Sequence, residues 1–305
     1  MQKIKSLKFK AAALVLSALT ACGGGGSSAP VTKTGYFIDS AVAGLEYTSG
    51  STTGITGADG SFQYEEGQPV SFKIGSMNLG SVTVKNSRIF PVDLVSGAAD
   101  ETDAKVSLMA QILQTLDNDG NPSNGITITD KTRKAINQAI EVASADPTQT
   151  TAAINQLLAN ATADRATGPA SALVNAAAAK NHLNANLVKE FAGNWTSSFT
   201  GNDSGTCQVT VSQIGLIGGT CTSTLAGSFT ISGRIESSGN WQNGSAPTVA
   251  PSSAASSAAS TAKSNGSGSA STGAVFDGSF TRAGNAAGTW VNGSSYAGTW
   301  TMAKQ

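Results

Sequence analysis

The sequence predicts a multidomain α+β protein with a β-rich part, a helical part and a second β-rich part, in that order. In both β-rich parts, apolar residues alternate in short runs between Gly-rich turns, which is the period of half-buried strands. Between them, from about 103 to 191, apolar residues recur at helical spacing. We therefore expect a small N-terminal β-sandwich over 35–98, a central Ala-rich helical bundle over 99–191, and an antiparallel up-and-down β-barrel over 192–305.

The residues before the first domain carry the pattern of a secretory signal. Four lysines precede an apolar run, 11–19, that is too short to remain as a transmembrane helix. Small residues and Cys22 follow, as at a cleavage site. We predict a signal peptide over 1–21 and a flexible, Gly- and Ser-rich tether over 22–34.

Cys22 is the first residue of the predicted mature chain. The preceding Leu19-Thr20-Ala21 makes the site resemble the lipobox of bacterial lipoproteins. The resemblance implies a diacylglyceryl group on the Cys22 thiol and a third acyl chain, such as palmitate, on its amine. Gly23 replaces the Asp of an inner-membrane retention signal, which favours the outer membrane. The alternative is an ordinary secreted protein with a coincidental Cys, and orientation toward the surface or the periplasm stays open.

The N-terminal β-rich part shows its strands through alternating aromatic and aliphatic residues. Phe62 and Tyr64 are expected on one face of a strand, and Gly57-Ala58-Asp59-Gly60 is a turn signal between two strands. With 43–45, this run resembles the prealbumin-like or carboxypeptidase-regulatory-like β-sandwich. With 70–75 and 79–80 added, it more closely resembles the N-terminal module of uncharacterised Gram-negative surface lipoproteins of the adhesin-like kind. The resemblance implies a fold, and such sandwiches serve many functions.

Capping residues mark the predicted helices of the central part. One helix is expected from about Asp103. A second helix is expected to be capped by Thr129 or Asp130 and to carry Ile136 and Ile140. Asp146-Pro147 combines an N-cap with Pro at the first helical position. Pro169 is expected to open the last helix, which would carry Leu173, Ala176, Leu183, Leu187 and Phe191.

A Gly-x-Trp unit recurs in the last third of the chain and contains all four Trp residues, Trp195, Trp241, Trp290 and Trp300. Seven or eight short strands with Gly-rich turns predict an up-and-down barrel or, alternatively, a compact sandwich, and in a barrel the Trp side chains would plug the interior. The pattern resembles lipocalin-like and avidin-like barrels. The segment 242–272 is nearly all Ser, Ala, Gly, Asn and Thr, and we predict a disordered insertion there.

Cysteine and charge content bound the function. Cys207 and Cys221 are expected to form a disulfide in an oxidising compartment, because a metal or catalytic thiol pair would lack nearby His or Cys partners. Four of the 19 basic residues lie in the signal, so 15 basic residues face 19 acidic ones and the mature net charge is −4. Without a basic stripe, nucleic acid is excluded as a partner.

The loop Asp117-Asn118-Asp119-Gly120-Asn121 is the sharpest candidate for chemistry. Oxygens of Asp117, Asp119 and Asn121 would suit Ca²⁺, and the run loosely resembles the start of an EF-hand or dockerin loop. Pro122 and Ile128 stand where that pattern has Gly and a bidentate Glu. The alternative is a helix-ending loop whose Asx side chains cap backbone amides. Apart from Ca²⁺, no cofactor is expected.

Nothing in the sequence forms a catalytic set. His182 is the only histidine and is expected on a helix, and the adjacent Glu65 and Glu66 would point to opposite faces of a strand.

We therefore expect a non-enzymatic, lipid-anchored envelope protein, an adhesin-like or interaction module that contacts host or neighbouring-cell surface molecules. The alternative is a small-ligand carrier whose C-terminal barrel is the cup; a hydrolase with scattered residues is a third hypothesis. The sequence leaves the partner or ligand and the oligomeric state open.

Overall fold

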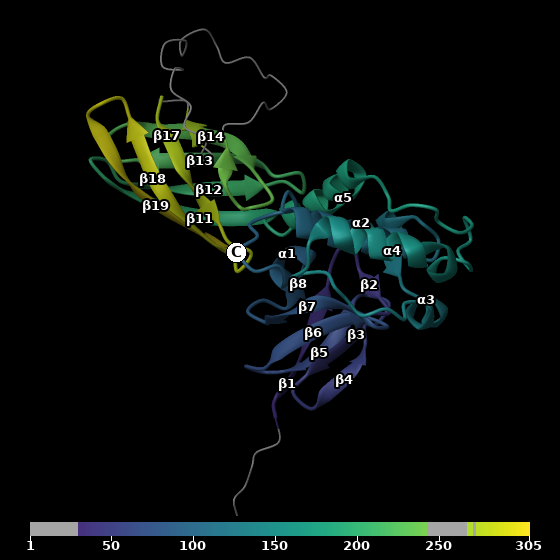
Figure 1. Ribbon diagram of the computed structural model, residues 1–305. Coiled ribbons are helices and arrows are strands. Elements are labelled where there is room, and N and C mark those ends of the chain that lie inside the picture. The colour runs from purple at the N-terminus through teal and green to yellow at the C-terminus, as the bar shows by residue number, and fades with distance from the viewer. Residues whose placement is uncertain (1–29, 243–266, 271–272) are drawn as a thin grey trace, which may run out of the picture. The chain divides into compact units, whose positions relative to one another are not determined.

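A computed structural model describes residues 30–242, 267–270 and 273–305 of the chain. It shows a mixed α+β protein that consists mostly of β-sheet (Figure 1). From Val31 onward the chain forms one compact unit. The predicted signal peptide and residues 22–29 of the predicted tether lie outside the described residues, as does most of the predicted insertion. The tether prediction is wrong at its end, because residues 32–34 belong to a strand, β1, and pair with β5.

Three sheets are formed within the first half of the described chain. A three-stranded sheet has the order β5-β1-β8, a five-stranded sheet the order β10-β7-β6-β3-β4, and β2 pairs with β9. Their bounds are β1 Thr32–Phe37, β2 Val42–Ala43, β3 Glu46–Ser49, β4 Thr52–Ile55, β5 Ser61–Glu65, β6 Pro69–Ile74, β7 Met77–Thr83, β8 Arg88–Ile89, β9 Ile126–Thr127 and β10 Ile140–Glu141.

The alternation in the sequence corresponds to burial in these strands. Phe62 and Tyr64 are buried in β5, and every second residue of β6 from Val70 to Ile74 is fully buried. Rings from the two larger sheets meet, since Phe72 of β6 contacts Phe37 of β1 and Phe62 of β5 edge-on. The predicted turn at 57–60 joins β4 to β5, with the Gly60 amide donating to the Gly57 carbonyl. A prealbumin-like β-sandwich stays a prediction.

The described helices all belong to the segment between β8 and the last sheet. Their bounds are α1 Pro91–Leu94, α2 Ala104–Thr115, the 3-10 helix η1 Pro122–Asn124, α3 Asp130–Ala135, α4 Pro147–Ala161 and α5 Ala176–Lys189. Asp103, Thr129 and Asp146 cap α2, α3 and α4 with their side chains. The caps at Thr129 and Asp146 were predicted from the sequence.

Two of the helix predictions need correction. The last helix does not begin at Pro169 but at Ala176, because the Asn175 side chain accepts hydrogen bonds from the Ala177 and Ala178 amides and caps it there. The second helix ends at Ala135. Ile140, expected on that helix, instead lies in β10 and pairs with Met77 of β7.

The helices share a hydrophobic core with the sheets. Buried residues of α2, α4 and α5 belong to the same cluster as those of β1, β5, β6 and β7. The short strands β9 and β10, from the region expected to be helical, pair in parallel with β2 and β7. Among the described residues, the helices therefore do not enclose a bundle core of their own.

The last third of the chain forms a curled, antiparallel, barrel-like sheet (Figure 1). The strand order is β13-β12-β11-β19-β18-β17-β16-β14-β15. An additional pairing connects β13, the first strand of this order, with β14, the last but one. The bounds are β11 Gly193–Gly201, β12 Gly205–Val211, β13 Leu216–Ser223, β14 Gly227–Ile235, β15 Trp241–Gln242, β16 Ser267–Ala270, β17 Val275–Phe280, β18 Asn285–Asn292 and β19 Tyr296–Lys304. Strand β16 falls within the segment predicted to be disordered.

The Gly-x-Trp units of β18 and β19 fit into one another. Gly288 is paired with Trp300 across the two strands, and Trp290 is paired with Gly298. A Cβ at Gly288 would lie 2.6 Å from the Trp300 ring and 1.9 Å from the Asp277 carbonyl oxygen. Each Gly thus makes room for the Trp of the neighbouring unit, which explains why the two residue types recur together.

Candidate functional site

The predicted disulfide between Cys207 and Cys221 is confirmed. The two residues lie directly opposite each other in β12 and β13, with their Cα atoms 4.0 Å apart. Both are buried in the hydrophobic core of the barrel-like sheet. The bond therefore fixes the register of two neighbouring strands from inside the sheet.

The predicted lipid anchor cannot be followed in the structure. Cys22 lies outside the described residues, so its acylation stays a prediction. None of the described helices combines the length and the apolar character that a membrane crossing needs.

The oxygens of the candidate calcium loop bind backbone amides. Asp117 Oδ1 accepts a hydrogen bond from the Thr127 amide at 2.8 Å, and Asp119 Oδ1 accepts one from the Asn121 amide at 2.9 Å. Asn121 Oδ1 in turn accepts from the Ser123 amide at 3.3 Å. These are the capping contacts of the alternative prediction, and they order the chain between α2 and β9.

The two carboxyl groups of this loop have opposite pKa shifts. Burial raises the pKa of Asp117, whose Oδ2 has no hydrogen-bond partner among the described residues. The Asn124 side-chain amide, followed by the Asn121 backbone amide, lowers the pKa of Asp119. No group of three or more His, Cys, Asp or Glu side chains is placed to hold a metal ion in the described part of the chain. Calcium binding stays a prediction that these contacts do not support.

His182 lies on α5 in a buried polar cluster that the sequence did not indicate. Its Nε2 atom is 3.1 Å from Ser40 Oγ, 3.2 Å from Asn186 Nδ2 and 3.8 Å from Asp39 Oδ1. The Asp39 side chain is fully buried, and its Oδ2 accepts a hydrogen bond from Gln114. Ser40 is the only described non-glycine residue with a positive φ, 57°. The cluster joins residues far apart in the chain, and no local motif connects them.

Burial dominates the electrostatics of this cluster. It raises the pKa of Asp39 to about 7, although the Gln114 hydrogen bond opposes the shift. Burial also lowers the pKa of His182, against the opposing effect of the Asp39 carbonyl oxygen. In a catalytic triad, the Ser hydroxyl and the carboxylate bind opposite nitrogens of the His ring. Here Ser40 Oγ and the Asp39 carboxylate both approach Nε2 of His182, so the carboxylate does not have the triad arrangement.

Large aromatic rings fill the interior of the barrel-like sheet. Trp195, Trp241 and Trp300 are at most 1% exposed, and Trp241 contacts Trp300 edge-on at 5.3 Å. Phe280 touches all three of these Trp rings. Of the polar ring atoms, Trp195 Nε1 donates to the Phe191 carbonyl oxygen and Trp300 Nε1 to those of Asp277 and Thr289. The predicted plugging of the interior by Trp side chains is therefore observed.

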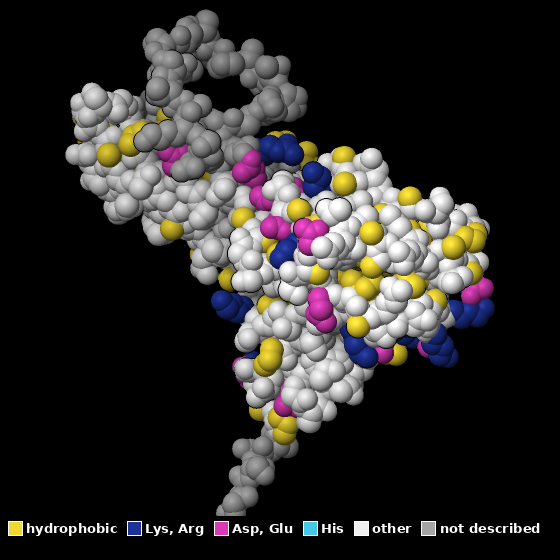
Figure 2. Space-filling model, viewed as in Figure 1, with side chains coloured by type: hydrophobic (Ala, Val, Ile, Leu, Met, Phe, Trp, Pro, Cys, Tyr) yellow, Lys and Arg dark blue, Asp and Glu magenta, His cyan; other side chains and the backbone are white. Residues whose placement is uncertain are grey.

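One end of the barrel-like sheet carries a small apolar groove of about 190 Å³. It is lined by Asp203, Leu225, Ala226, Trp290, Asn292 and Tyr296. Leu225 and Tyr296 are among the most exposed large apolar residues described, at 65% and 48%. On the face shown in Figure 2, by contrast, most of the described barrel surface bears neither charged nor hydrophobic side chains.

The loops around this groove are tied together by Asp203. Its carboxylate accepts hydrogen bonds from Ser223 Oγ at 2.6 Å and Thr224 Oγ1 at 2.9 Å. Although burial raises the pKa of Asp203, these hydroxyl contacts lower it below its ordinary value overall. The carboxylate is thus occupied within the protein, and the exposed part of the groove is apolar and aromatic.

Comparison with known proteins yields no relative. No family model, no curated protein and no solved structure matches this chain.

Proposed function

We propose that this chain is a non-enzymatic, lipid-anchored protein of the Gram-negative outer membrane that acts as an adhesin-like or interaction module. The sequence from the basic start to Cys22 supports the anchor, and 23–28 would serve as its flexible tether. The N-terminal β-rich part is proposed to be the adhesin-like sandwich, and the C-terminal part a barrel of the lipocalin- or avidin-like kind.

The observation that carries the proposal is the filled interior of the barrel-like sheet. A carrier needs an internal cavity lined by apolar groups. Here three Trp rings and Phe280 occupy that space and contact one another. The interior therefore favours a stable display domain over the alternative of small-ligand carriage.

The end of the barrel-like sheet that carries the small groove supplies a contact surface for this domain. Exposed Leu225 and Tyr296 beside Trp290 form an apolar groove whose single carboxylate, Asp203, is engaged by hydroxyl groups of the protein. Apolar and aromatic groups at the centre of a contact, with little free charge, are typical of protein interaction sites. The proposed partner is a host or neighbouring-cell surface molecule with an uncharged, partly apolar face.

Protease shaving of intact cells tests the proposal, with permeabilised cells as the control. We expect the C-terminal region to be cleaved on intact cells, and a Cys22→Ser variant to leave the membrane fraction. Cleavage only after permeabilisation would place the body in the periplasm and contradict the surface-module proposal. A Leu225→Ser/Tyr296→Ser variant should keep its fold and surface display but lose binding to partner cells.

A further inference from the structure

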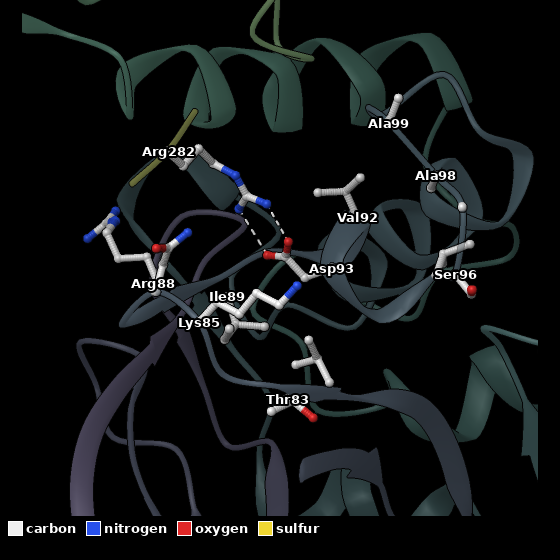
Figure 3. A pocket seen from close by; sticks show the side chains of 14 residues that line it. Thr83, Lys85, Arg88, Ile89, Val92, Asp93, Ser96, Ala98, Ala99 and Arg282 are labelled. Carbon is white, nitrogen blue, oxygen red and sulfur yellow. Dashed lines mark hydrogen bonds and ion pairs between the residues drawn. The ribbon is translucent and has the colours of Figure 1, made fainter. Parts of the chain in front are cut away.

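The proposed function does not use a charged pocket of about 370 Å³ on the described surface (Figure 3). Its walls come from the end of β7, the strand β8, the helix α1 with the turn that follows it, and the turn between β17 and β18. Its polar side chains belong to Thr83, Lys85, Asn86, Arg88, Asp93, Ser96 and Arg282. The lining thus contains three cationic side chains and a single carboxylate.

Both oxygens of that carboxylate are engaged within the protein. Asp93 Oδ2 accepts hydrogen bonds from the Phe90 amide at 2.8 Å and from Arg282 Nη1 at 2.9 Å, and Asp93 Oδ1 accepts from Arg282 Nη2. The Arg282 guanidinium also lies over the Phe90 ring, 5.0 Å from its centroid. Asp93 and Arg282 therefore form a fixed, charge-neutral floor, as Figure 3 shows.

The cations around this floor retain donors that no described residue accepts. No carboxylate of the described residues lies within ion-pair distance of Lys85 Nζ, which Figure 3 shows extending toward the Asp93–Arg282 pair. Arg88, at the rim, donates to Glu190 Oε1 only through Nε, at 2.7 Å. Arg282 uses two of its five N–H groups on Asp93. The pocket thus offers hydrogen-bond donors with net positive charge.

We propose that this pocket binds an oxyanion group, a phosphate ester or a carboxylate, on a small polar molecule of sugar size. Unpaired ammonium and guanidinium donors recognise such groups through charge-assisted hydrogen bonds. The pocket volume falls within the range of small-ligand sites, about 300–1,000 Å³. Thr83 and Asn86 supply hydroxyl and amide groups for the polar body of the ligand, and Ile89 and Val92 supply an apolar wall.

Lys85 is the residue expected to set the affinity, because among the cations of the pocket it is the one whose charge no described carboxylate compensates. Removing it leaves the Asp93–Arg282 pair intact, so a Lys85→Gln variant should fold normally. Lys134→Gln is the control, since it removes the same charge from an exposed α3 residue that does not line the pocket. Arg88→Gln tests the rim separately.

Isothermal titration of the full mature chain in detergent tests the proposal, with glucose 6-phosphate, galacturonate, inorganic phosphate and uncharged galactose as probes. We expect saturable binding of at least one anionic sugar, no binding of galactose, and weakening at higher salt. Preference for the phosphate ester or for the uronate identifies the oxyanion.

Lys85→Gln should weaken that binding at least about tenfold, which corresponds to the loss of one charge-assisted contact, while Lys134→Gln leaves it unchanged. Binding of galactose as tight as that of the anions, binding equal in Lys85→Gln and wild type, or no saturable binding of any anionic probe would each overturn the proposal. None of these results bears on surface display, so the proposed function is tested independently.

Discussion

The two hydrophobic cores of this chain are built from different side chains. The elements from β1 to α5 form the first region, and those from β11 to β19 form the second. The core shared by the sheets and helices of the first region has 36 buried residues, of which six are aromatic. The core of the barrel-like sheet has 19, of which nine are aromatic, and it contains all four Trp residues. In the second region, strands rich in Gly, Ser and Thr obtain their buried volume from a few large rings. Its stability is thus concentrated in single residues, whereas that of the first region is distributed.

The largest expected effect comes from removing one of those rings. Trp300→Ala should lower the free energy of unfolding of the barrel-like sheet by about 3–5 kcal/mol, because the loss of a buried ring leaves a cavity between Trp241 and Phe280. The three remaining Trp residues report the transition by fluorescence in urea. Phe72→Ala is the matched change in the first core and should shift the helical circular dichroism transition instead. Equal shifts of both signals in either variant would contradict the comparison.

One pH effect should arise in the first region, from Asp39 and His182. Because the pKa of Asp39 is raised from 3.8 to about 7 by burial, its protonated form stabilises the fold, and this stability is lost as the pH rises through about 7. His182 has the opposite sign, since its lowered pKa removes stability as the pH falls below 6.5. The Asp39 contribution changes by at most about 1.4 kcal/mol per pH unit.

An Asp39→Asn variant isolates this contribution. Between pH 5 and 8, it should gain stability relative to the wild type as the pH rises, because Asn cannot ionise. The measurement is the urea midpoint of the helical circular dichroism signal at several pH values. A constant difference between variant and wild type across this range would show that Asp39 does not titrate there.

The disulfide should act only on the second region. Its loop of about 15 residues corresponds to roughly 3 kcal/mol in the chain-entropy account. A Cys207→Ala/Cys221→Ala variant is expected to lower the fluorescence-detected midpoint by this amount and to leave the helical signal in place. The wild type under reducing conditions is the control. A matching fall in the helical signal would mean that the two cores unfold together.

The smallest expected effect tests where α5 begins. Asn175→Ala removes the cap of this helix and should cost about 1 kcal/mol in the first region. Pro169→Ala should change the stability of the helix by much less, because Pro169 precedes the helix. Thermal unfolding followed by circular dichroism distinguishes the two. A larger loss for Pro169→Ala would restore the start that the sequence suggested.

Local signals predicted much of this fold. Alternation predicted burial in β5 and β6, Asp146-Pro147 predicted the start of α4, and Cys207 and Cys221 predicted the disulfide. The Pro169 prediction failed because a Pro suits both a helix start and an irregular segment, and the Asn175 cap decided between them. Strands β9 and β10 were missed because each has two residues and is defined by its distant partner.

The candidate sites were harder to predict than the elements. Lys85 and Arg282 carry no local motif and come together only through the packing of distant turns. The same holds for Asp39, Gln114 and His182, which are brought together by tertiary structure. By contrast, the filling of the barrel interior could be predicted from the recurring Gly-x-Trp unit, and in β18 and β19 the Gly of each unit is paired with the Trp of the other.

The most direct test of the two-core account is urea unfolding of the wild-type chain followed at once by Trp fluorescence and by the helical circular dichroism signal. All Trp residues belong to the barrel-like sheet, and all described helices belong to the first region, so each probe reports one core. We predict two transitions with different midpoints, since separate cores unfold as separate units. Superimposable transitions would contradict the account and show that the cores unfold cooperatively as one.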